Sequence, residues 1–195
     1  MFTTGLVLAA GKSSRLGQPK QLLEYRGTTL LDNTLDVARS CGFDQLILAL
    51  GGAAAEVRDH VDLSGCVVAD NVHYTTGCSS SIVAALDNID DQADGMVLLL
   101  GDQPNVAATS VAALLATAAT GSTPVAVCHY DNGRGHPFWF ARSTFDALAT
   151  LHGDKAVWKL IESGRWPVAD VEVTGTVPLD VDTWDDYEKL QSASL

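Results

Sequence analysis

The chain has 195 residues, of which 47% are hydrophobic and 18% are charged, and its formal net charge is −12. This composition is typical of a folded chain, and the length suits one domain, residues 1–195, with a substantial core. So acidic a surface argues against a nucleic-acid partner, because binding to a phosphate backbone requires a basic face. No apolar run reaches the roughly 20 residues of a membrane span, and the first residues lack a signal-peptide pattern. We therefore expect a cytoplasmic protein without a membrane partner.

The first predicted element is a buried strand over Gly5–Ala10, and a loop of small and basic residues follows it. Glycine lets a backbone approach a ligand closely, free N–H groups donate, and cations neutralise charge, so such a loop suits phosphates. It is not a Walker A loop, since Leu6 stands where the first glycine is needed, and it lacks the G-x-G-x-x-G dinucleotide fingerprint. An ordinary polar loop is the alternative. The loop residues concerned are Gly11, Lys12, Ser13, Ser14, Arg15, Gly17 and Lys20.

Helices and strands alternate in the next part of the chain. Thr28 or Thr29 is expected to cap a helix that runs to about Ser40, because apolar residues recur there at helical spacing. Further along, small hydroxyl residues within 71–86 form a loop that opens into a helix. The other elements predicted here are a strand over 45–50, a helix over 53–60 and a strand over 66–69.

Met96–Leu100 is a fully apolar run, as expected of a central parallel strand that is covered on both faces. A helix over 107–119 and a strand over 124–128 follow it. Strands that alternate with helices predict an α/β fold with a mostly parallel sheet. In such sheets ligands bind beyond the carboxyl ends of the strands, where both the first loop and the Gly101–Pro104 turn are expected to lie.

Two acidic segments are candidates for a metal site. Asp102 directly follows the apolar run, and Mg²⁺ prefers one or two carboxylates together with phosphate oxygens and water. The alternative is a turn aspartate that bonds to its own backbone. Near the C-terminus Asp180 and Asp182 alternate, so in a strand both would point to one face. Thr183 is expected to cap the final helix, with Asp186 three residues later completing a capping box.

Free N–H groups at the start of the helix within 71–86 suit an anionic ligand, with a plain serine cap as the alternative. Cys78 near that helix end is either a thiol of lowered pKa or a buried, inert one, and the four cysteines show no metal-ligand spacing. Residues 132–140 predict a glycine turn that leads into an aromatic strand. His136 in that strand is either a structural residue or part of a site.

The segment LAAGKSSRLGQPK resembles the signature L-A-A-G-x-S-x-R-M/L-G-x-x-K of the MobA-like nucleotidyltransferases, and is most similar to their molybdenum cofactor cytidylyltransferases. The resemblance implies a single-domain, Rossmann-like three-layer α/β/α fold of the nucleotide-diphospho-sugar transferase type. It also implies that Lys20 and Arg15 are catalytic cations that hold the triphosphate. The nucleotide-binding residues that it implies are Leu8, Ala9, Ala10, Gly11, Lys12, Ser13 and Ser14.

Two acidic motifs extend the resemblance. GDQP is similar to the family's GDQP/GDMP motif, which implies that Asp102 binds Mg²⁺. D-V-D-T-x-x-D-Y is similar to the family's D-x-D-T ending, which implies a second metal ligand at Asp182, with Asp180 as the alternative.

Three further segments concern the base and the acceptor. Residues 71–81 resemble N-x-x-W-x-x-G-x-x-S-S, which implies nucleotide binding by Gly77 and Ser81. The GHP segment is similar to the family's acceptor motif, which implies acceptor binding by His136 and Pro137. The chain departs from the pattern at 153–158, where GDKAVW stands against G-D-x-G-A-R, so that Trp158 occupies the position of the arginine.

The resemblance implies a Mg²⁺-dependent nucleotidyltransferase that transfers CMP from CTP to molybdopterin and releases diphosphate. CTP is favoured because relatives that use GTP carry L-A-G-G, and the methyl group of Ala10 would narrow the pocket for a purine. One alternative is GTP or another nucleotide with a sugar phosphate or other cofactor precursor. Another is a non-catalytic nucleotide-binding protein, and a redox enzyme is disfavoured by the missing dinucleotide fingerprint. The sequence leaves the oligomeric state open.

Overall fold

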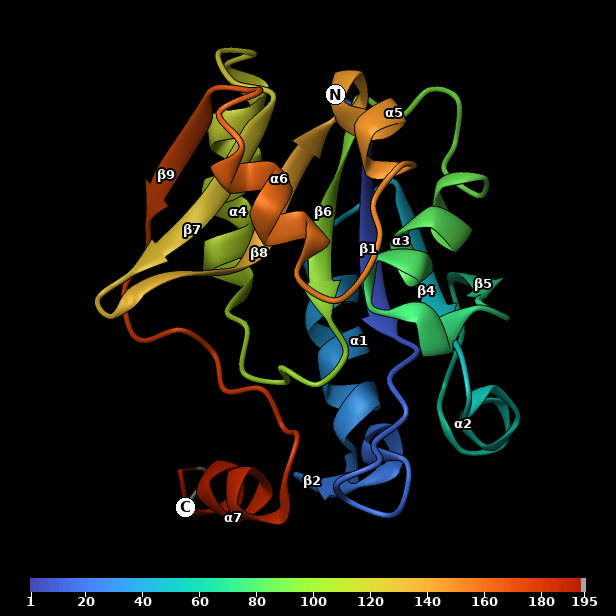
Figure 1. Cartoon of the computed structure of the whole chain (residues 1–195). Coiled ribbons are helices and arrows are strands. Elements are labelled where there is room, and N and C mark those ends of the chain that lie inside the picture. The colour runs from blue at the N-terminus through green and yellow to red at the C-terminus, as the bar shows by residue number, and fades with distance from the viewer. Residues whose placement is uncertain (194–195) are drawn as a thin grey trace.

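The computed structural model describes residues 1–193 of the chain. A sheet of seven strands forms its centre, in the order β5-β4-β1-β6-β8-β7-β9 (Figure 1). β8 runs antiparallel to β6 and β7, so the other six strands share one direction and the sheet is mostly parallel, as predicted. The strands are β1 (Thr3–Ala9), β4 (Gln45–Leu50), β5 (Cys66–Asp70), β6 (Gly95–Leu100), β7 (Val125–Tyr130), β8 (Gly133–Ala141) and β9 (Val168–Glu172).

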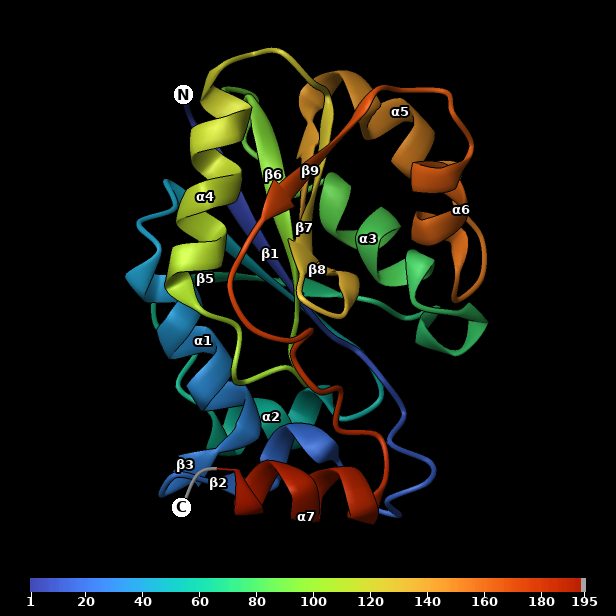
Figure 2. The same cartoon turned by 90° about the vertical axis from the view of Figure 1, so that its left-hand side faces the viewer.

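Helices cover both faces of the sheet, which gives the three layers that the sequence predicts (Figure 2). Among the described residues, no helix is long and apolar enough to cross a membrane. The helices on one face are α1 (Leu30–Ser40), α2 (Ala54–His60) and α4 (Ala108–Ala119). The helices on the other face are α3 (Ser79–Leu86), α5 (Phe145–Leu148) and α6 (Ala156–Glu162).

The central strands β1, β4 and β6 are apolar over most of their length because both of their faces are buried. On β1, Val7 packs into the cluster beneath α1 and α4, whereas Leu6 packs into the cluster beneath α3 and α6. Neither side chain is exposed to solvent. β1 is also hydrogen-bonded to β4 on one side and to β6 on the other, so the loop that leaves it is anchored in the middle of the sheet.

A separate layer lies below the carboxyl ends of β1, β4 and β6 (Figure 1). It contains a short 3₁₀ turn, Lys20–Leu22, the hairpin of β2 (Glu24–Tyr25) and β3 (Thr28–Thr29), and the final helix α7 (Trp184–Ser192). Val181 and Leu190 from the C-terminal segment pack on Leu23 and Leu30 in one buried cluster. The C-terminal segment is therefore fastened next to the loop that follows β1.

Both helix starts that were predicted from capping residues are confirmed. Thr29, and not Thr28, caps α1 in a capping box with Asp32. Thr183 caps α7 in a capping box with Asp186. Each cap satisfies helix N–H groups that would otherwise lack partners.

Candidate functional site

A pocket of about 820 Å³ opens at the carboxyl ends of β1 and β6, where the fold is expected to bind a ligand. It extends from the loop after β1 to the start of β8 and is closed on another side by the C-terminal segment. The residues proposed from the sequence that line it are Leu8, Ala9, Ala10, Gly11, Lys12, Lys20, Gly77, Ser81, Asp102, Asp182 and His136.

The loop after β1 turns sharply at Ser13, whose φ of 52° is uncommon for a residue other than glycine. The carbonyl of Ser13 accepts from the N–H groups of Leu16 and Gly17, at 3.0 and 3.2 Å. Its hydroxyl oxygen accepts from the backbone N–H of Lys20 at 2.9 Å. Ser13 thus holds the base of Lys20 in place rather than facing the pocket, and Ser14 also lies outside the pocket lining.

The ammonium group of Lys20 lies between two carboxylates. Its Nζ donates to Oδ2 of Asp102 and, at 2.7 Å, to Oδ1 of Asp182. The side chains of Lys20 and Asp102 are only 11% and 17% exposed, so this pair is shielded from water. Burial by itself would lower the pKa of Lys20, but the two carboxylates outweigh it and raise the pKa above its ordinary value. Lys20 is therefore a permanent cation in the floor of the pocket.

Arg15 is held by the same aspartate but lies outside the pocket lining. Its Nη2 donates to Oδ2 of Asp182 at 2.6 Å, and the arginine side chain is 63% exposed. Burial tends to raise the pKa of Asp182, yet Lys20 and Arg15 together lower it below the usual range. Asp182 therefore joins two cations of the first loop to the C-terminal segment.

Asp180 faces the same pocket from the C-terminal segment. Its Oδ1 accepts from Nε2 of Gln103 at 2.7 Å. Burial and the nearby charge of Asp102 raise the pKa of Asp180 to about 6. Within the described part of the chain, residues 173–183 form no strand, so Asp180 and Asp182 share the pocket through a loop and not through strand alternation.

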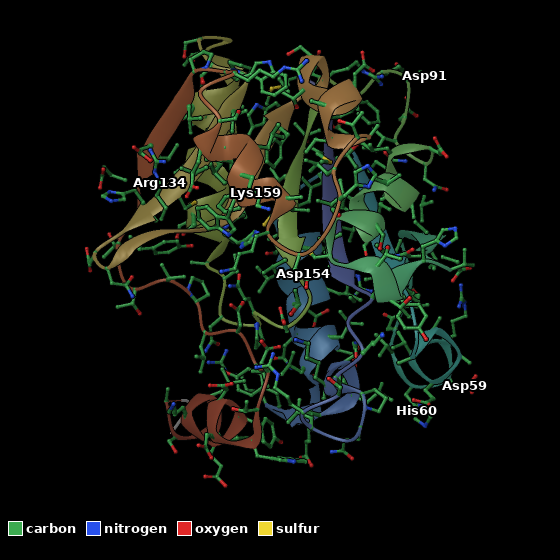
Figure 3. All side chains as sticks on the ribbon, viewed as in Figure 1. Asp59, His60, Asp91, Arg134, Asp154 and Lys159 are labelled. Carbon is green, nitrogen blue, oxygen red and sulfur yellow. The ribbon has the colours of Figure 1, made fainter. Side chains whose placement is uncertain are left out.

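The start of α3 forms the wall opposite this cluster. Gly77 has a φ of 119°, and a Cβ placed there would come within 2.7 Å of the Gly153 backbone. The N–H of Cys78 donates to Oδ1 of Asp154 at 3.0 Å, and Figure 3 shows Asp154 beside the carboxyl ends of β1 and β6. Ser81 is buried and its hydroxyl accepts from Asn71 at 3.0 Å.

Cys78 faces the pocket and is exposed, so the alternative of a buried thiol is wrong, and the alternative of a thiol with a lowered pKa is wrong as well. The surrounding protein atoms and the charges of Asp102 and Asp154 raise its pKa to about 11, against a smaller opposite effect of Lys20. A thiol with that pKa stays protonated near neutral pH and is a poor nucleophile.

His136 lines the pocket at the start of β8 and belongs to a group of aromatic rings in contact with one another. Its ring stacks on Phe138 with centroids 4.0 Å apart, and Trp158 meets it edge-on at 6.3 Å. Burial lowers the pKa of His136 to about 3, so the ring is neutral. Pro137 follows it through a cis peptide bond and is buried outside the pocket lining, so its side chain shapes the strand and does not face a ligand.

Two buried glutamines that were not predicted as site residues position the groups around them, although Gln103 lies in the GDQP segment. Nε2 of Gln21 donates to the carbonyl oxygens of Ala9 and Gly11, at 2.7 and 3.3 Å, and so clamps the start of the loop. Nε2 of Gln103 donates to Pro178 at 3.2 Å as well as to Asp180. A buried amide satisfies backbone carbonyls that would be costly to leave unpaired.

The carboxylates fit a divalent cation that arrives with phosphates. Asp102 and Asp182 already bind one cation, the ammonium group of Lys20, between them. Among the described residues no group of three or more histidine, cysteine or acidic side chains forms a ready metal cage. Mg²⁺ needs only one or two protein carboxylates when phosphate oxygens and water complete its shell. Asp102 and Asp182 meet that requirement.

Comparison with known proteins identifies the family. Residues 5–169 match the model of the MobA-like NTP transferase domain. The crystal structure of Rv0371c from Mycobacterium tuberculosis H37Rv is 55% identical, covers 97% of each chain and has a TM-score of 0.90. A structure of Rv0371c in complex with manganese is 50% identical over 99% of this chain and 100% of that one, with a TM-score of 0.87.

Two further relatives have names that describe different reactions. "Nicotine blue oxidoreductase" of Paenarthrobacter nicotinovorans is 29% identical and aligns with 96% of this chain and 95% of its own. "Probable molybdenum cofactor guanylyltransferase" of Bacillus cereus is 31% identical over 134 residues, 68% of this chain and 64% of its own. Because the family model spans most of the sequence, the chain belongs to the MobA-like NTP transferase family, a family of nucleotidyltransferases.

Proposed function

We propose that the protein transfers CMP from CTP to a phosphate-bearing acceptor in the cytoplasm, with Mg²⁺ as cofactor and molybdopterin in its molybdenum form as the leading acceptor. The observation that carries the proposal is the Lys20 ammonium group held between Asp102 and Asp182, beside the glycine-bearing loop and inside the pocket. A protonated lysine, loop N–H groups and paired carboxylates are the groups that a triphosphate and its metal require.

In the proposed reaction an oxygen of the acceptor phosphate attacks the α-phosphorus of CTP. The bond from that phosphorus to the oxygen bridging the β-phosphorus breaks, and diphosphate leaves with the electron pair. Lys20 would neutralise the charge that develops on the leaving group, and Arg15, which lies outside the pocket lining, would have to leave Asp182 to assist it. The backbone N–H groups of Gly11 and Lys12, which line the pocket, would bind the same phosphate chain. The acceptor phosphate is already an anion, so the reaction needs no general base.

Asp102 and Asp182 would hold the divalent ion, with Asp180 next to them. When bound, Mg²⁺ supplies charge neutralisation at the phosphate oxygens. Lys20 would then exchange its two carboxylate partners for phosphate oxygens. The manganese complex of the Rv0371c relative supports a divalent cation in this chain, since the two sequences are 50% identical over their whole length.

The base preference rests on Ala10. A Cβ placed at Gly51 would lie 2.8 Å from the Cβ of Ala10 and 2.7 Å from that of Tyr74, so Ala10 and Tyr74, which line the pocket, pack closely around Gly51. An added methyl group in such a wall favours the smaller base by about 1–3 kcal/mol. The Bacillus cereus relative is named for guanylyl transfer, and GTP is therefore the second candidate. That name also supports a molybdenum cofactor acceptor.

The first test is thermal unfolding of the protein with CTP, GTP, ATP or UTP, each with and without Mg²⁺. A ligand at 100 times its dissociation constant stabilises by about 2.7 kcal/mol, which moves the midpoint measurably. We expect the largest Mg²⁺-dependent shift with CTP. A larger shift with GTP would keep the reaction and overturn the base assignment. NADPH is included because one relative is named as an oxidoreductase, and a shift with NADPH alone would contradict nucleotidyl transfer.

The second test is diphosphate release from CTP and Mg²⁺ in the presence of molybdopterin, of a sugar phosphate, or of no acceptor. Release with molybdopterin only would support the full proposal. Release with a sugar phosphate only would establish the alternative acceptor. A protein that binds CTP but releases no diphosphate with any acceptor would be a nucleotide-binding protein.

A further inference from the structure

The two strands at the edges of the sheet differ in how they are protected. β5 and β9 lie at opposite ends of the sheet, as Figure 1 shows, and each has five residues. An edge strand presents unpaired backbone N–H and C=O groups that can pair with another chain, unless charged side chains, proline or a covering segment prevent it. The two edges are equally long, so only their side chains distinguish them.

Charged side chains protect the edge at β9. Asp170 forms an ion pair with Arg134, with 2.6 Å between its Oδ1 and Nε of the arginine. Glu172 lies two residues further along the strand, and its Oε1 is 3.0 Å from Nδ1 of His129. Charges at alternate positions of an edge strand disfavour the approach of a second strand. We therefore expect β9 to remain a free edge.

The edge at β5 lacks such protection. Its residues 66–69 are uncharged and include no proline, and Asp70 carries the one charge of the strand. Val67 is 41% exposed, and Val72, just beyond the strand, is 77% exposed. Exposed apolar side chains on an uncharged edge favour pairing with another chain.

The backbone groups of β5 that point away from the sheet follow from its pairing with β4. The N–H group of Asn71 donates to the carbonyl of Leu50 in β4 at 2.8 Å. Backbone groups alternate between the two sides of a strand, so those of Val68 and Asp70, and the carbonyl of Cys66, point outward. β5 thus offers outward donors and acceptors that are distributed around Val68.

These outward groups are complementary to a second copy of the same strand in the antiparallel direction. With a two-fold axis at Val68, the two Val68 residues would donate to and accept from each other. Asp70 of each copy would donate through its N–H group to the carbonyl of Cys66 in the other copy. The axis makes every contact twice, as in the isologous interfaces of symmetric dimers.

A hollow of about 320 Å³ next to β5 fits an exposed side chain of the second copy, and we call it the β5 hollow. Its lining combines the apolar side chains of Phe43, Leu46 and Val67 with the polar side chains of Arg39, Asp44 and Gln45. In the same antiparallel register, Val72 of one copy lies opposite Ser64 of the other, next to Gly65, which also lines the hollow. Removal of these exposed valines from water favours the dimer.

The charges at the two ends of β5 are compatible with this pairing. Asp70 of one copy would lie opposite Cys66 of the other, on the same face of the sheet. Arg39 lies beside Cys66, where its charge opposes the rise in the pKa of the thiol that burial causes. Asp70 is exposed beside Arg58 and can therefore also meet Arg39 of the second copy. The acidic partners of Arg39 in its own chain are largely exposed, so solvent screens them.

We propose that the chain forms a two-fold symmetric dimer in which β5 pairs antiparallel with β5 of a second copy, and Val72 of each copy enters the β5 hollow of the other. The sheet then continues through both copies. β5, which the structure describes in full, contributes no residue to the pocket at the carboxyl ends of β1 and β6, so both pockets remain open. None of these contacts involves a nucleotide, so the dimer is expected whether or not the protein transfers CMP.

Sedimentation equilibrium of the full chain over a wide range of concentrations tests the dimer. One chain has a mass of 20.5 kDa, and we expect a reversible dimer of twice that mass. A monomer at every concentration would overturn the proposal.

The variant Val68→Pro removes an outward N–H group but no hydrogen bond to β4, and proline is tolerated on an edge strand whose N–H faces solvent. We expect a folded monomer, with folding checked by circular dichroism. Val168→Pro is the matched control on β9, where the N–H of Val173 donates to His129 of β7 and that of Val168 therefore points outward. It should remain a dimer. An unchanged dimer in Val68→Pro, or a monomer in Val168→Pro alone, would overturn pairing through β5.

The variant Val72→Ser tests the β5 hollow without touching the strand, and so exposed a side chain can be replaced without loss of the fold. We expect the dissociation constant of the dimer to rise by roughly tenfold or more. Leu179→Ser is the control, because Leu179 is an exposed apolar residue of the C-terminal segment. An unchanged dissociation constant in Val72→Ser would overturn the contact with the hollow.

The variant Val68→Cys tests the register of the two strands. Facing Cα atoms of a hydrogen-bonded antiparallel pair are about 5.5 Å apart, which is within the range that a disulfide spans. We expect mild oxidation to give a disulfide-linked dimer. The wild type, in which Cys78 is exposed, controls for linkage through native thiols. Linkage no greater than in the wild type would overturn the two-fold axis at Val68.

Discussion

At the scale of single residues, Lys20 separates two carboxylates that would otherwise repel each other, and it competes with any metal for them. We predict that Lys20→Ala lowers turnover by about 10²–10³-fold, because a preorganised charge at the transferring phosphate is lost. The same variant should bind manganese more tightly in the absence of nucleotide, since the competing ammonium group is gone. Both effects are measured on one preparation, by diphosphate release and by calorimetric titration.

Lys159→Ala provides the control for Lys20→Ala. Lys159 is exposed on α6 and, as Figure 3 shows, lies away from the carboxyl ends of the parallel strands. Its loss should change neither turnover nor manganese binding. Weaker manganese binding in Lys20→Ala would contradict the competition between the lysine and the metal.

His136 should make the stability of the protein sensitive to acid. Its pKa is about 3 in the folded chain and about 6.5 when unfolded, so the unfolded state takes up a proton first as the pH falls. This contribution to stability is fully present above pH ~6.5 and is lost at up to about 1.4 kcal/mol per pH unit between pH ~6.5 and ~3. Urea unfolding of the wild type and of His136→Gln at pH 7 and pH 4.5 measures it.

The variant His136→Gln should lose less stability than the wild type over that interval. His60→Gln is the matched substitution, because it makes the same change at an exposed histidine at the end of α2. Equal acid dependence in the wild type and His136→Gln would mean that the imidazole is protonated in the folded protein.

At the scale of elements, the helices α1 and α7 both begin with a capping box, but only the cap of α7 directly follows a proposed metal ligand. Thr29 and Thr183 each form a capping box, but Asp182 stands directly before Thr183. We predict that Thr29→Ala and Thr183→Ala each destabilise the protein by about 0.5–2 kcal/mol. Only Thr183→Ala should also weaken manganese binding, because the backbone that carries Asp182 is freed. Urea unfolding and calorimetric titration of both variants provide the test.

A second element-scale prediction concerns the close approach of the α3 start to the loop at Gly153. Gly77 has a positive φ, and a Cβ there would meet the Gly153 backbone at 2.7 Å, so Gly77→Ala combines strain with a clash. Gly133 has a similar φ of 124° but nothing within 4 Å of the position that its Cβ would take. Gly77→Ala should therefore destabilise more than Gly133→Ala, by at least about 1 kcal/mol beyond the cost of the unfavourable φ at both positions. Similar unfolding midpoints for the two variants would count against the clash.

Strands with a continuous apolar sequence could be predicted from the sequence. Strands that form only because they pair with a neighbouring strand could not. The strand Gln45–Leu50 is apolar after its first residue, and the prediction from the sequence has the bounds that the structure has. The antiparallel direction of β8 was not predicted, although Asn132-Gly133 at the tight connection from β7 is a hairpin signal. β9 (VADVE) mixes charges with apolar residues and becomes a strand by pairing with β7.

The same distinction between local sequence and distant contacts applies to the candidate site. The loop after β1 could be placed from its composition, but the turn at Ser13 that directs Ser14 and Arg15 away from the pocket depends on a single backbone angle. Lys20 and Asp182 are 162 residues apart, so only the resemblance to a family placed them together before the fold was known. Gln21 acts through backbone carbonyls, which no residue pattern reveals. Gln103 lies in the GDQP segment, but its hydrogen bond to Asp180 could be seen only in the fold.

At the scale of the whole molecule, the proposed function requires a chain with a net charge of −12 to bind a polyanionic nucleotide next to three carboxylates. Without a metal, a triphosphate in the pocket would meet Asp102, Asp180 and Asp182 while Lys20 and Arg15 remain paired with carboxylates. A divalent ion would neutralise the acids and free both cations for the phosphates. CTP and metal should therefore strengthen each other's binding, with a coupling of about 1–3 kcal/mol.

Calorimetric titration in both orders tests this coupling, because thermodynamic linkage requires that the metal change the affinity for CTP by the same factor as CTP changes the affinity for the metal. The coupling should fall as NaCl is raised, since salt screens the repulsion between the triphosphate and the acidic pocket at separations beyond about 10 Å. Asp182→Asn should weaken it further, because that variant removes one of the two proposed metal ligands and a partner of both cations. Equal CTP affinity with and without Mg²⁺ at low salt would show that the triphosphate displaces Lys20 from the carboxylates without help from a metal.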